Sequence, residues 1–205
     1  MNKKQLIQRV IKPTIFILST LPFVYIVLGI FWQQSIFQQY LGADPQKYIV
    51  HKMGEWTLKF LVITLSITPF RRWLKRPELI QFRRMFGLFT MFYASMHLLS
   101  YYLLYLEMDI SNVIDDIVKR PYITIGFLGF LLLIPLAFTS TKGWMRKLGK
   151  KWQKLHKLIY IVAALAILHF FWQVKSDLNE PVLYLIIITI LLGSRLNYWR
   201  FKSSQ

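Results

Sequence analysis

Residues 151–173 read KWQKLHKLIYIVAALAILHFFWQ, a long apolar run with a basic edge and two histidines. The run is long enough for an α-helix to cross the hydrocarbon core of a bilayer, which takes about 20 residues. His156 lies among lysines, whereas His169 lies among aliphatic and aromatic residues. An imidazole is rare in hydrocarbon, because nothing there solvates its polar nitrogens. The run therefore predicts a transmembrane helix whose histidines have specific partners.

The whole chain combines a high apolar content with a strong positive charge. Of its 205 residues 55% are hydrophobic, yet the formal net charge is +17. Nucleic-acid-binding proteins and membrane proteins with basic cytoplasmic loops both have such a charge. Here the charges fall between long apolar segments, which favours the membrane protein and argues against a nucleic-acid partner. The chain has no cysteine, so disulfides, iron–sulfur clusters and thiolate ligands are excluded.

Six apolar segments follow one another along the chain. They are residues 14–32, 56–70, 85–106, 122–138, 158–172 and 182–198. Several are shorter than a full span, but flanking Trp, Tyr, Lys and Arg side chains reach the interface and extend them. The basic N-terminus resembles a signal peptide, yet the first segment has the length of a span and no clear cleavage site. We predict an all-α integral membrane bundle of six transmembrane helices, in a single domain over residues 1–205.

Basic and acidic residues occupy alternate loops. The N-terminus, residues 71–84, residues 142–157 and the C-terminal end with Arg195 are basic, whereas residues 107–116 and 177–180 are acidic. Basic loops stay on the cytoplasmic side, so both termini are predicted to be cytoplasmic. The acidic outer loops reflect this orientation or form a docking face for a basic partner. The inner positive charge also suits a flavin phosphate or anionic membrane lipid.

His156 and His169 cannot bind the same metal ion, because 13 residues of helix separate them by about 20 Å. His97, in the third segment, lies at a depth similar to that of His169, and the two segments cross the membrane in the same direction. Two imidazoles from facing helices form the axial pair of an electron-transfer haem. We predict a haem whose iron is bound by His97 and His169. The alternative for each is a hydrogen-bonded packing residue.

A second group of candidate residues lies at the cytoplasmic end. At the depth of His156 the third segment offers Arg83 and Arg84 in place of a histidine. With Lys151 and Trp152, these residues predict an inner flavin site, in which the cations bind the phosphate and the aromatic residue contacts the ring. A second haem site and a solvated interfacial histidine are the alternatives.

One further histidine, His51, precedes the second segment on the outer side. We interpret it as a loop or interface residue.

Several stretches resemble one known family. They are LKFLVITLSITPFRR (58–72), HLLSYYLL (97–104), KRPYITIGFLG (119–129), LAFTSTKGWMRKLGKKWQKLHKLIY (136–160) and ILHFFW (167–172). In this order they resemble the haem-binding membrane subunits of the MsrPQ methionine sulfoxide reductase system, the MsrQ (YedZ) family of the ferric-reductase-like transmembrane group. The family's three shared histidines fall on His97, His156 and His169. HKMGEW (51–56) departs from the family pattern, since Met53 replaces the usual Thr.

The resemblance implies an electron conduit in the bacterial inner membrane. Proteins of this family bind b-type haem and FMN, and draw electrons from the quinone pool or a cytosolic flavin reductase. They pass these electrons to MsrP, a periplasmic molybdoenzyme that repairs oxidised methionines. The chain has no G-x-G-x-x-G fingerprint and no soluble domain for NAD(P)H. Catalytic reduction of the sulfoxide is therefore expected on the partner.

Two other functions are compatible with the same residues. A stand-alone transmembrane ferric or quinone reductase would reduce a small acceptor at the outer haem edge without a protein partner. A non-redox scaffold or small-solute transporter would use the histidines for packing or proton relay.

Overall fold

The described part of the chain is almost entirely helical. The computed structural model describes residues 2–31, 42–174 and 177–203, and no strand occurs among them. The helices are α1 (Lys3–Leu6), α2 (Lys12–Phe31), α4 (Pro45–Trp73), α5 (Ile80–Leu104), α6 (Ile110–Lys119), α7 (Pro121–Phe138), α8 (Lys142–Leu148), α9 (Lys150–Leu155), α10 (Leu158–Gln173) and α11 (Asn179–Ser203). A π-helical turn over Ile7–Ile11 joins α1 to α2, and a 3₁₀ turn over Pro77–Leu79 precedes α5. The all-α prediction is confirmed.

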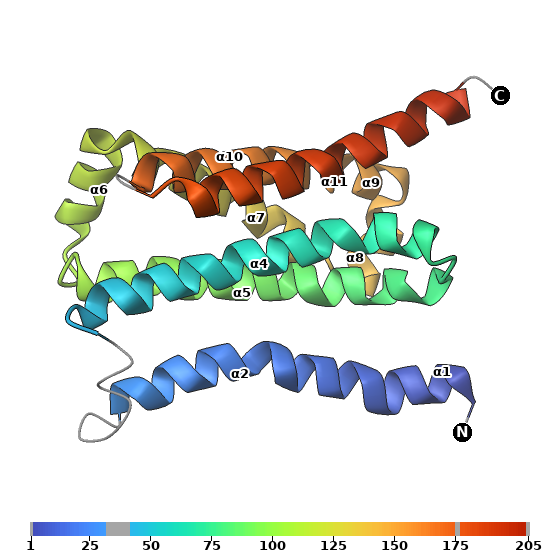
Figure 1. Ribbon diagram of the computed structural model, residues 1–205, viewed down its shortest axis with the longest axis horizontal. Coiled ribbons are helices and arrows are strands. Elements are labelled where there is room, and N and C mark those ends of the chain that lie inside the picture. Colours follow the sequence, from blue (N-terminus) through green and yellow to red (C-terminus); the bar gives the residue numbers. More distant parts are fainter. Residues whose placement is uncertain (1, 32–41, 175–176, 204–205) are drawn as a thin grey trace.

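The long helices lie side by side along the length of the molecule (Figure 1). Helix α4 packs mainly against α5, α7 packs mainly against α10, and α11 contacts both α4 and α10. Helix α2 runs along the outer side of the α4–α5 pair. The two ends of the chain lie at the same end of the bundle (Figure 1), as an even number of lengthwise passes requires. The short helix α6 lies at the opposite end.

A tyrosine fixes α2 against α5. The side chain of Tyr93 is fully buried. Its hydroxyl donates to the carbonyl of Ser19 (2.8 Å) and accepts from the amide of Phe23 (3.2 Å). Pro22, which has no N–H, lies inside α2 between these two backbone groups. The hydroxyl therefore binds the main chain of α2 where Pro22 interrupts the backbone hydrogen bonds of that helix.

Helix α4 is longer than the sequence predicted, because it begins at Pro45 and not at residue 56. Asp44 caps its first turn, and proline is a favourable first residue of a helix. Inside the helix Glu55 forms ion pairs with Lys52 (2.6 Å) and Lys59 (2.5 Å). These pairs neutralise the charges along one face of the helix. The helix therefore extends through the polar residues that precede residue 56, where the apolar segment begins.

The run over residues 151–173 is not one uninterrupted helix. Helix α9 ends at Leu155 and α10 begins at Leu158, with His156 and Lys157 between them. His156 caps α9, and the next amide, that of Lys157, donates to the carbonyl of Lys154 (3.2 Å), three residues back instead of the four of an α-helix. The predicted run is therefore interrupted by a two-residue turn at His156, although Lys150–Gln173 as a whole is still long and apolar enough to cross a membrane.

Three helical runs are long and apolar enough to cross a membrane, judged by length and composition over the described residues. They are Lys3–Ile30, Pro121–Phe138 and Lys150–Gln173. These runs indicate a membrane protein. Helices α4, α5 and α11 lie alongside them in the same bundle. Six spans with both termini in the cytoplasm remain the prediction.

This topology can be tested with single cysteines, because the natural chain has none. The exposed residues Asn112 in α6 and Lys147 in α8 lie on opposite sides of the membrane in the predicted topology. We expect a membrane-impermeant maleimide to label Asn112→Cys in intact spheroplasts. Lys147→Cys should react only after the membrane is opened. Labelling in the reverse order would contradict the orientation.

Candidate functional site

A cavity of about 560 Å³ lies among α4, α5, α7 and α10. Its volume is in the range of sites that hold a cofactor-sized molecule, about 300–1,000 Å³. The lining is mostly apolar, and polar side chains such as Tyr101, Arg120 and Gln173 gather at its rim. Two histidines line it, His97 from α5 and His169 from α10. The structure thus brings together the two histidines that the sequence placed at one depth.

The imidazole rings of His97 and His169 lie close together, and in each ring one nitrogen, Nδ1, is hydrogen-bonded while the other, Nε2, is available. The ring centres are 6.2 Å apart, and the ring planes make an angle of 74°. Nδ1 of His97 lies 2.9 Å from the carbonyl oxygen of Val50, and Nδ1 of His169 lies 2.7 Å from that of Tyr122. A carbonyl oxygen can only accept a hydrogen bond, so each Nδ1 carries the proton. Each Nε2 therefore keeps its lone pair for a ligand.

The two histidines are held in the same way by neighbouring helices. Each carbonyl acceptor lies 47 residues before its histidine. One helical turn after each carbonyl comes a glycine, Gly54 in α4 and Gly126 in α7. A Cβ atom on Gly54 would lie 3.1 Å from Cε1 of His97, and one on Gly126 would lie 2.7 Å from Nδ1 of His169. The glycines therefore provide the space in which each ring lies against a backbone.

Sequence reasoning missed both glycines. Gly126 lies in KRPYITIGFLG, which was singled out for its likeness to a family, and Gly54 lies in HKMGEW, which was singled out for departing from the family pattern. The signal that could have identified them is a repeated spacing, since 43 residues separate the glycine from the histidine in both pairs. Local periodicity does not show this relation, because the two residues of each pair belong to different helices.

His51 lines the cavity and belongs to α4, so of the two predicted positions the loop is wrong and the interface stays a prediction. Its Nε2 is 2.9 Å from Nε2 of Gln173, the last residue of α10. This contact joins the two helices at the outer end, beside the cavity mouth.

Part of the predicted inner group is assembled around His156. Its Nε2 lies 3.1 Å from Oγ1 of Thr139, and its ring stacks on Trp152 with ring centres 3.9 Å apart. The indole N–H of Trp152 donates to the carbonyl of Thr139 (3.0 Å). Arg83, which is partly buried, lies close enough to His156 to interact with it electrostatically. Arg84 is exposed, so the structure gathers Arg83 and not its neighbour.

Lys151 is exposed as well. A different cation, Arg195, which the sequence placed among the cytoplasmic charges, is buried. Arg195 of α11 is 6% exposed, and it donates to the hydroxyl of Tyr160 (3.0 Å) and to the carbonyl of Leu65 (2.5 Å). Its Nε has no partner, and no carboxylate in the described ranges forms an ion pair with it. Arg195 and Arg83 interact electrostatically, so the inner end of the bundle has a cationic interior.

Comparison with known proteins defines the class first. Residues 53–167 match the family described as ferric reductase like transmembrane component. This class agrees with a helical membrane bundle that holds two facing histidines.

The relatives then define the particular family. Proteins named protein-methionine-sulfoxide reductase heme-binding subunit MsrQ are similar to this chain in several bacteria. The identity is 53% over 165 residues for Xanthomonas campestris pv. campestris (strain B100), covering 80% of this chain and 75% of the relative. It is 42% over 202 residues for Polaromonas naphthalenivorans (strain CJ2), covering 97% and 90%. The chain belongs to the MsrQ family, which confirms the resemblance seen in the sequence. No solved structure matches the chain.

The glycine–histidine contact predicts opposite effects for two neighbouring glycines of α7. Gly126→Ala should lower the free energy of unfolding by about 1–3 kcal/mol, because the new methyl group collides with the anchored ring of His169. At Gly129 a Cβ would lie 3.7 Å from Cβ of Leu165, an ordinary contact. Gly129→Ala should therefore stabilise the helix, by about 0.5–1 kcal/mol. Thermal unfolding followed by circular dichroism in detergent measures both, and equal effects would contradict the contact.

Proposed function

We propose that this chain is a b-type haem electron-transfer subunit of the bacterial inner membrane, in which His97 and His169 bind the haem iron. One observation carries the proposal. Two imidazoles, each with Nδ1 bonded to a main-chain carbonyl, leave their Nε2 atoms for a ligand in one cavity. The MsrQ relatives are heme-binding subunits by name, which supports the same cofactor here.

The spacing of the rings fits one iron between them. An imidazole nitrogen binds a metal at about 2 Å and the ring centre lies about 1 Å further back, so two axial ligands have ring centres about 6 Å apart. The observed separation is 6.2 Å. Over the described ranges, no three His, Asp or Glu side chains gather to hold a metal ion by themselves. Two imidazoles are enough for a metal ion whose other ligands come from a porphyrin ring.

The surrounding residues suit electron transfer more than catalysis at the metal. A bound haem supplies a one-electron carrier. Two histidine ligands leave no position for a substrate. The hydrogen bonds to Val50 and Tyr122 fix the orientation of both rings and raise the basicity of each Nε2. The apolar lining keeps water away from the ligands.

The proposed route crosses the membrane. Electrons come from the quinone pool or a cytosolic flavin reductase, and they leave on the periplasmic side to MsrP, a molybdoenzyme that reduces protein methionine sulfoxide. The names of the relatives support a role in methionine sulfoxide reduction. Since the chain offers no obvious group to attack a sulfoxide, the catalytic step is assigned to the partner.

An FMN site at the cytoplasmic end forms the second part of the proposal. Arg83 and the buried Arg195 supply cations for a phosphate, and Trp152 stacked on His156 supplies an aromatic surface. A buried cation without a carboxylate partner favours an anionic ligand nearby. A second haem at this end is the alternative occupant.

A stand-alone ferric or quinone reductase is the second candidate function. The match to the ferric reductase like transmembrane component supports it. Reduction of ferric chelates by the purified, haem-loaded chain without MsrP would favour this function over the subunit.

The haem assignment predicts different results for the three histidines. His97→Ala and His169→Ala should abolish the low-spin haem signal, because each removes one axial ligand. His156→Ala should keep most of it. Absorption and electron paramagnetic resonance spectra, with pyridine-haemochrome quantification per mole of protein, measure this. A colourless wild-type protein after haem-replete expression would refute the haem, and equal loss in all three variants would refute a separate role for His156.

The flavin assignment predicts a specific role for Arg83. Arg83→Gln should weaken FMN binding about tenfold, because a charge-assisted hydrogen bond to the phosphate is lost. Arg146→Gln, which removes an exposed cation of α8, is the control and should bind FMN like the wild type. Fluorescence titration with FMN measures both affinities. Equal affinities for all three proteins would remove Arg83 from the site, and no binding to the wild type would refute the flavin.

A further inference from the structure

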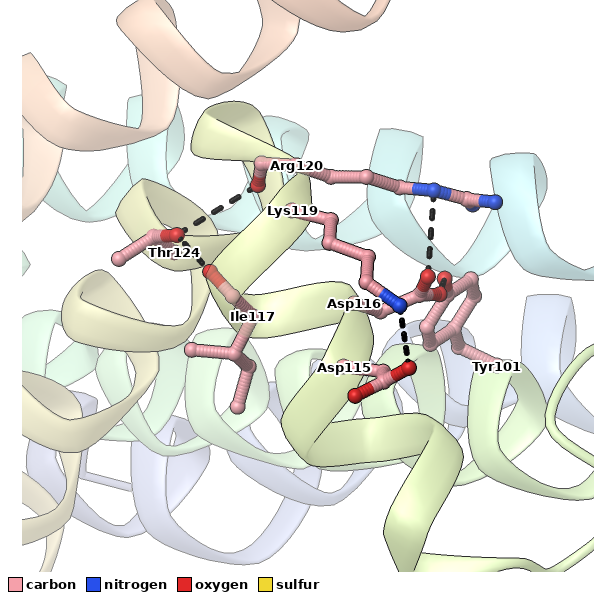
Figure 2. Close-up of polar contacts among 7 residues, drawn as sticks. All are labelled: Tyr101, Asp115, Asp116, Ile117, Lys119, Arg120 and Thr124. Carbon is pink, nitrogen blue, oxygen red and sulfur yellow. Dashed lines mark hydrogen bonds and ion pairs between the residues drawn. The ribbon is translucent and has the colours of Figure 1, made fainter.

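The junction between α6 and α7 places an arginine at the mouth of the histidine cavity. Arg120 is the last residue before α7 and lines the cavity. Its Nε lies 3.1 Å from Oδ1 of Asp116, one turn earlier in α6 (Figure 2). This ion pair uses one nitrogen of the guanidinium, and Tyr122 is a further hydrogen-bond partner of the Arg120 side chain. The two terminal nitrogens extend beyond Asp116 (Figure 2).

The carboxylate that holds Arg120 is itself held. The side chain of Asp116 is 15% exposed and accepts a hydrogen bond from the hydroxyl of Tyr101 in α5. The hydroxyl of Thr124 in α7 bonds the carbonyl of Ile117 in α6, which fixes the same junction from the other side (Figure 2). Three helices thus set the position of one guanidinium.

Arg120 is the cation with remaining binding capacity at this cavity. Of the described residues that line it, Lys52 and Arg120 are the permanently charged cations. Both are ion-paired, but Lys52 has a single nitrogen, which lies 2.6 Å from Glu55, whereas the guanidinium of Arg120 has further nitrogens beside the one that contacts Asp116. Partial burial lowers the pKa of the Arg120 guanidinium, but Asp116 and the nearby tyrosines raise it by more, so the group stays charged.

We propose that Arg120 binds a carboxylate of the molecule that occupies the cavity, namely a haem propionate, and that Asp116 positions it for this contact. The inference rests on the haem proposed above. A guanidinium matches a carboxylate with two parallel hydrogen bonds, and its several N–H donors exceed what Asp116 and Tyr122 accept from Arg120. This contact orients the propionate edge of the porphyrin toward the outer end of the bundle.

The neighbouring ion pair supplies a matched control. Lys119 and Asp115 form an ion pair with the same spacing in α6 (Figure 2). Their side chains are 69% and 62% exposed, and neither lines the cavity. Removing this cation changes the charge of the chain by the same amount without touching the site.

The experiment compares two porphyrins on the full chain in detergent. Apoprotein from haem-limited cells is titrated with haem b and with its dimethyl ester, which lacks both carboxylates, and the Soret band reports binding. Arg120→Gln should bind haem b about tenfold more weakly than the wild type. Lys119→Gln should match the wild type. For the dimethyl ester, the wild type and Arg120→Gln should have equal affinities.

Two results would overturn the inference. The first is that Arg120→Gln binds haem b as tightly as the wild type, and the second is a loss of affinity that is not confined to the porphyrin with carboxylates. An equal loss for both porphyrins would make Arg120 a structural residue. If Arg120→Gln does not fold, as judged by gel filtration, Arg120→Lys keeps the charge and is titrated in its place, with an intermediate affinity for haem b expected. A wild-type chain that binds neither porphyrin would refute the proposed function itself.

Discussion

A buried imidazole needs a partner for each of its two nitrogens, and in this bundle the main chain supplies one of them on both sides. The Nδ1 atoms of His97 and His169 bond to carbonyls of α4 and α7, the helices against which α5 and α10 pack. Glycines one turn along make these contacts possible. Two similar helix pairs result, α4 with α5 and α7 with α10. The Nε2 side of each imidazole is left to line the cavity between the two pairs.

The two ends of the bundle differ in chemistry. Towards the end of the bundle that carries α6, two imidazoles and several tyrosine side chains line a cavity. At the inner end, His156 has no histidine opposite it, and Arg83 and Arg195 supply positive charge in a partly buried setting. The first arrangement suits a metal centre and the second an anion.

The apolar pattern of the sequence was sufficient for the helical class and for the pairing of His97 with His169. That pairing followed from counting residues along two segments of the same direction. The start of α4 was misplaced, because Glu55 and its lysines are satisfied within the helix and so do not end it. Arg195 was counted only as one of the basic residues of the cytoplasmic side, and its burial by tertiary contacts with Tyr160 and Leu65 could not be seen from the sequence. Contacts between helices decide such positions, and a local pattern does not contain them.

The glycine beneath each histidine also has a consequence for assembly. Sliding α4 along α5, or α7 along α10, by one residue would drive a Cβ atom into a ring, so each pair of helices fits in a single register. The protein alone sets this register, through contacts that involve no bound molecule. A register fixed in this way also fixes how far apart the two imidazoles lie across the cavity, because each ring is seated against one residue of its neighbouring helix.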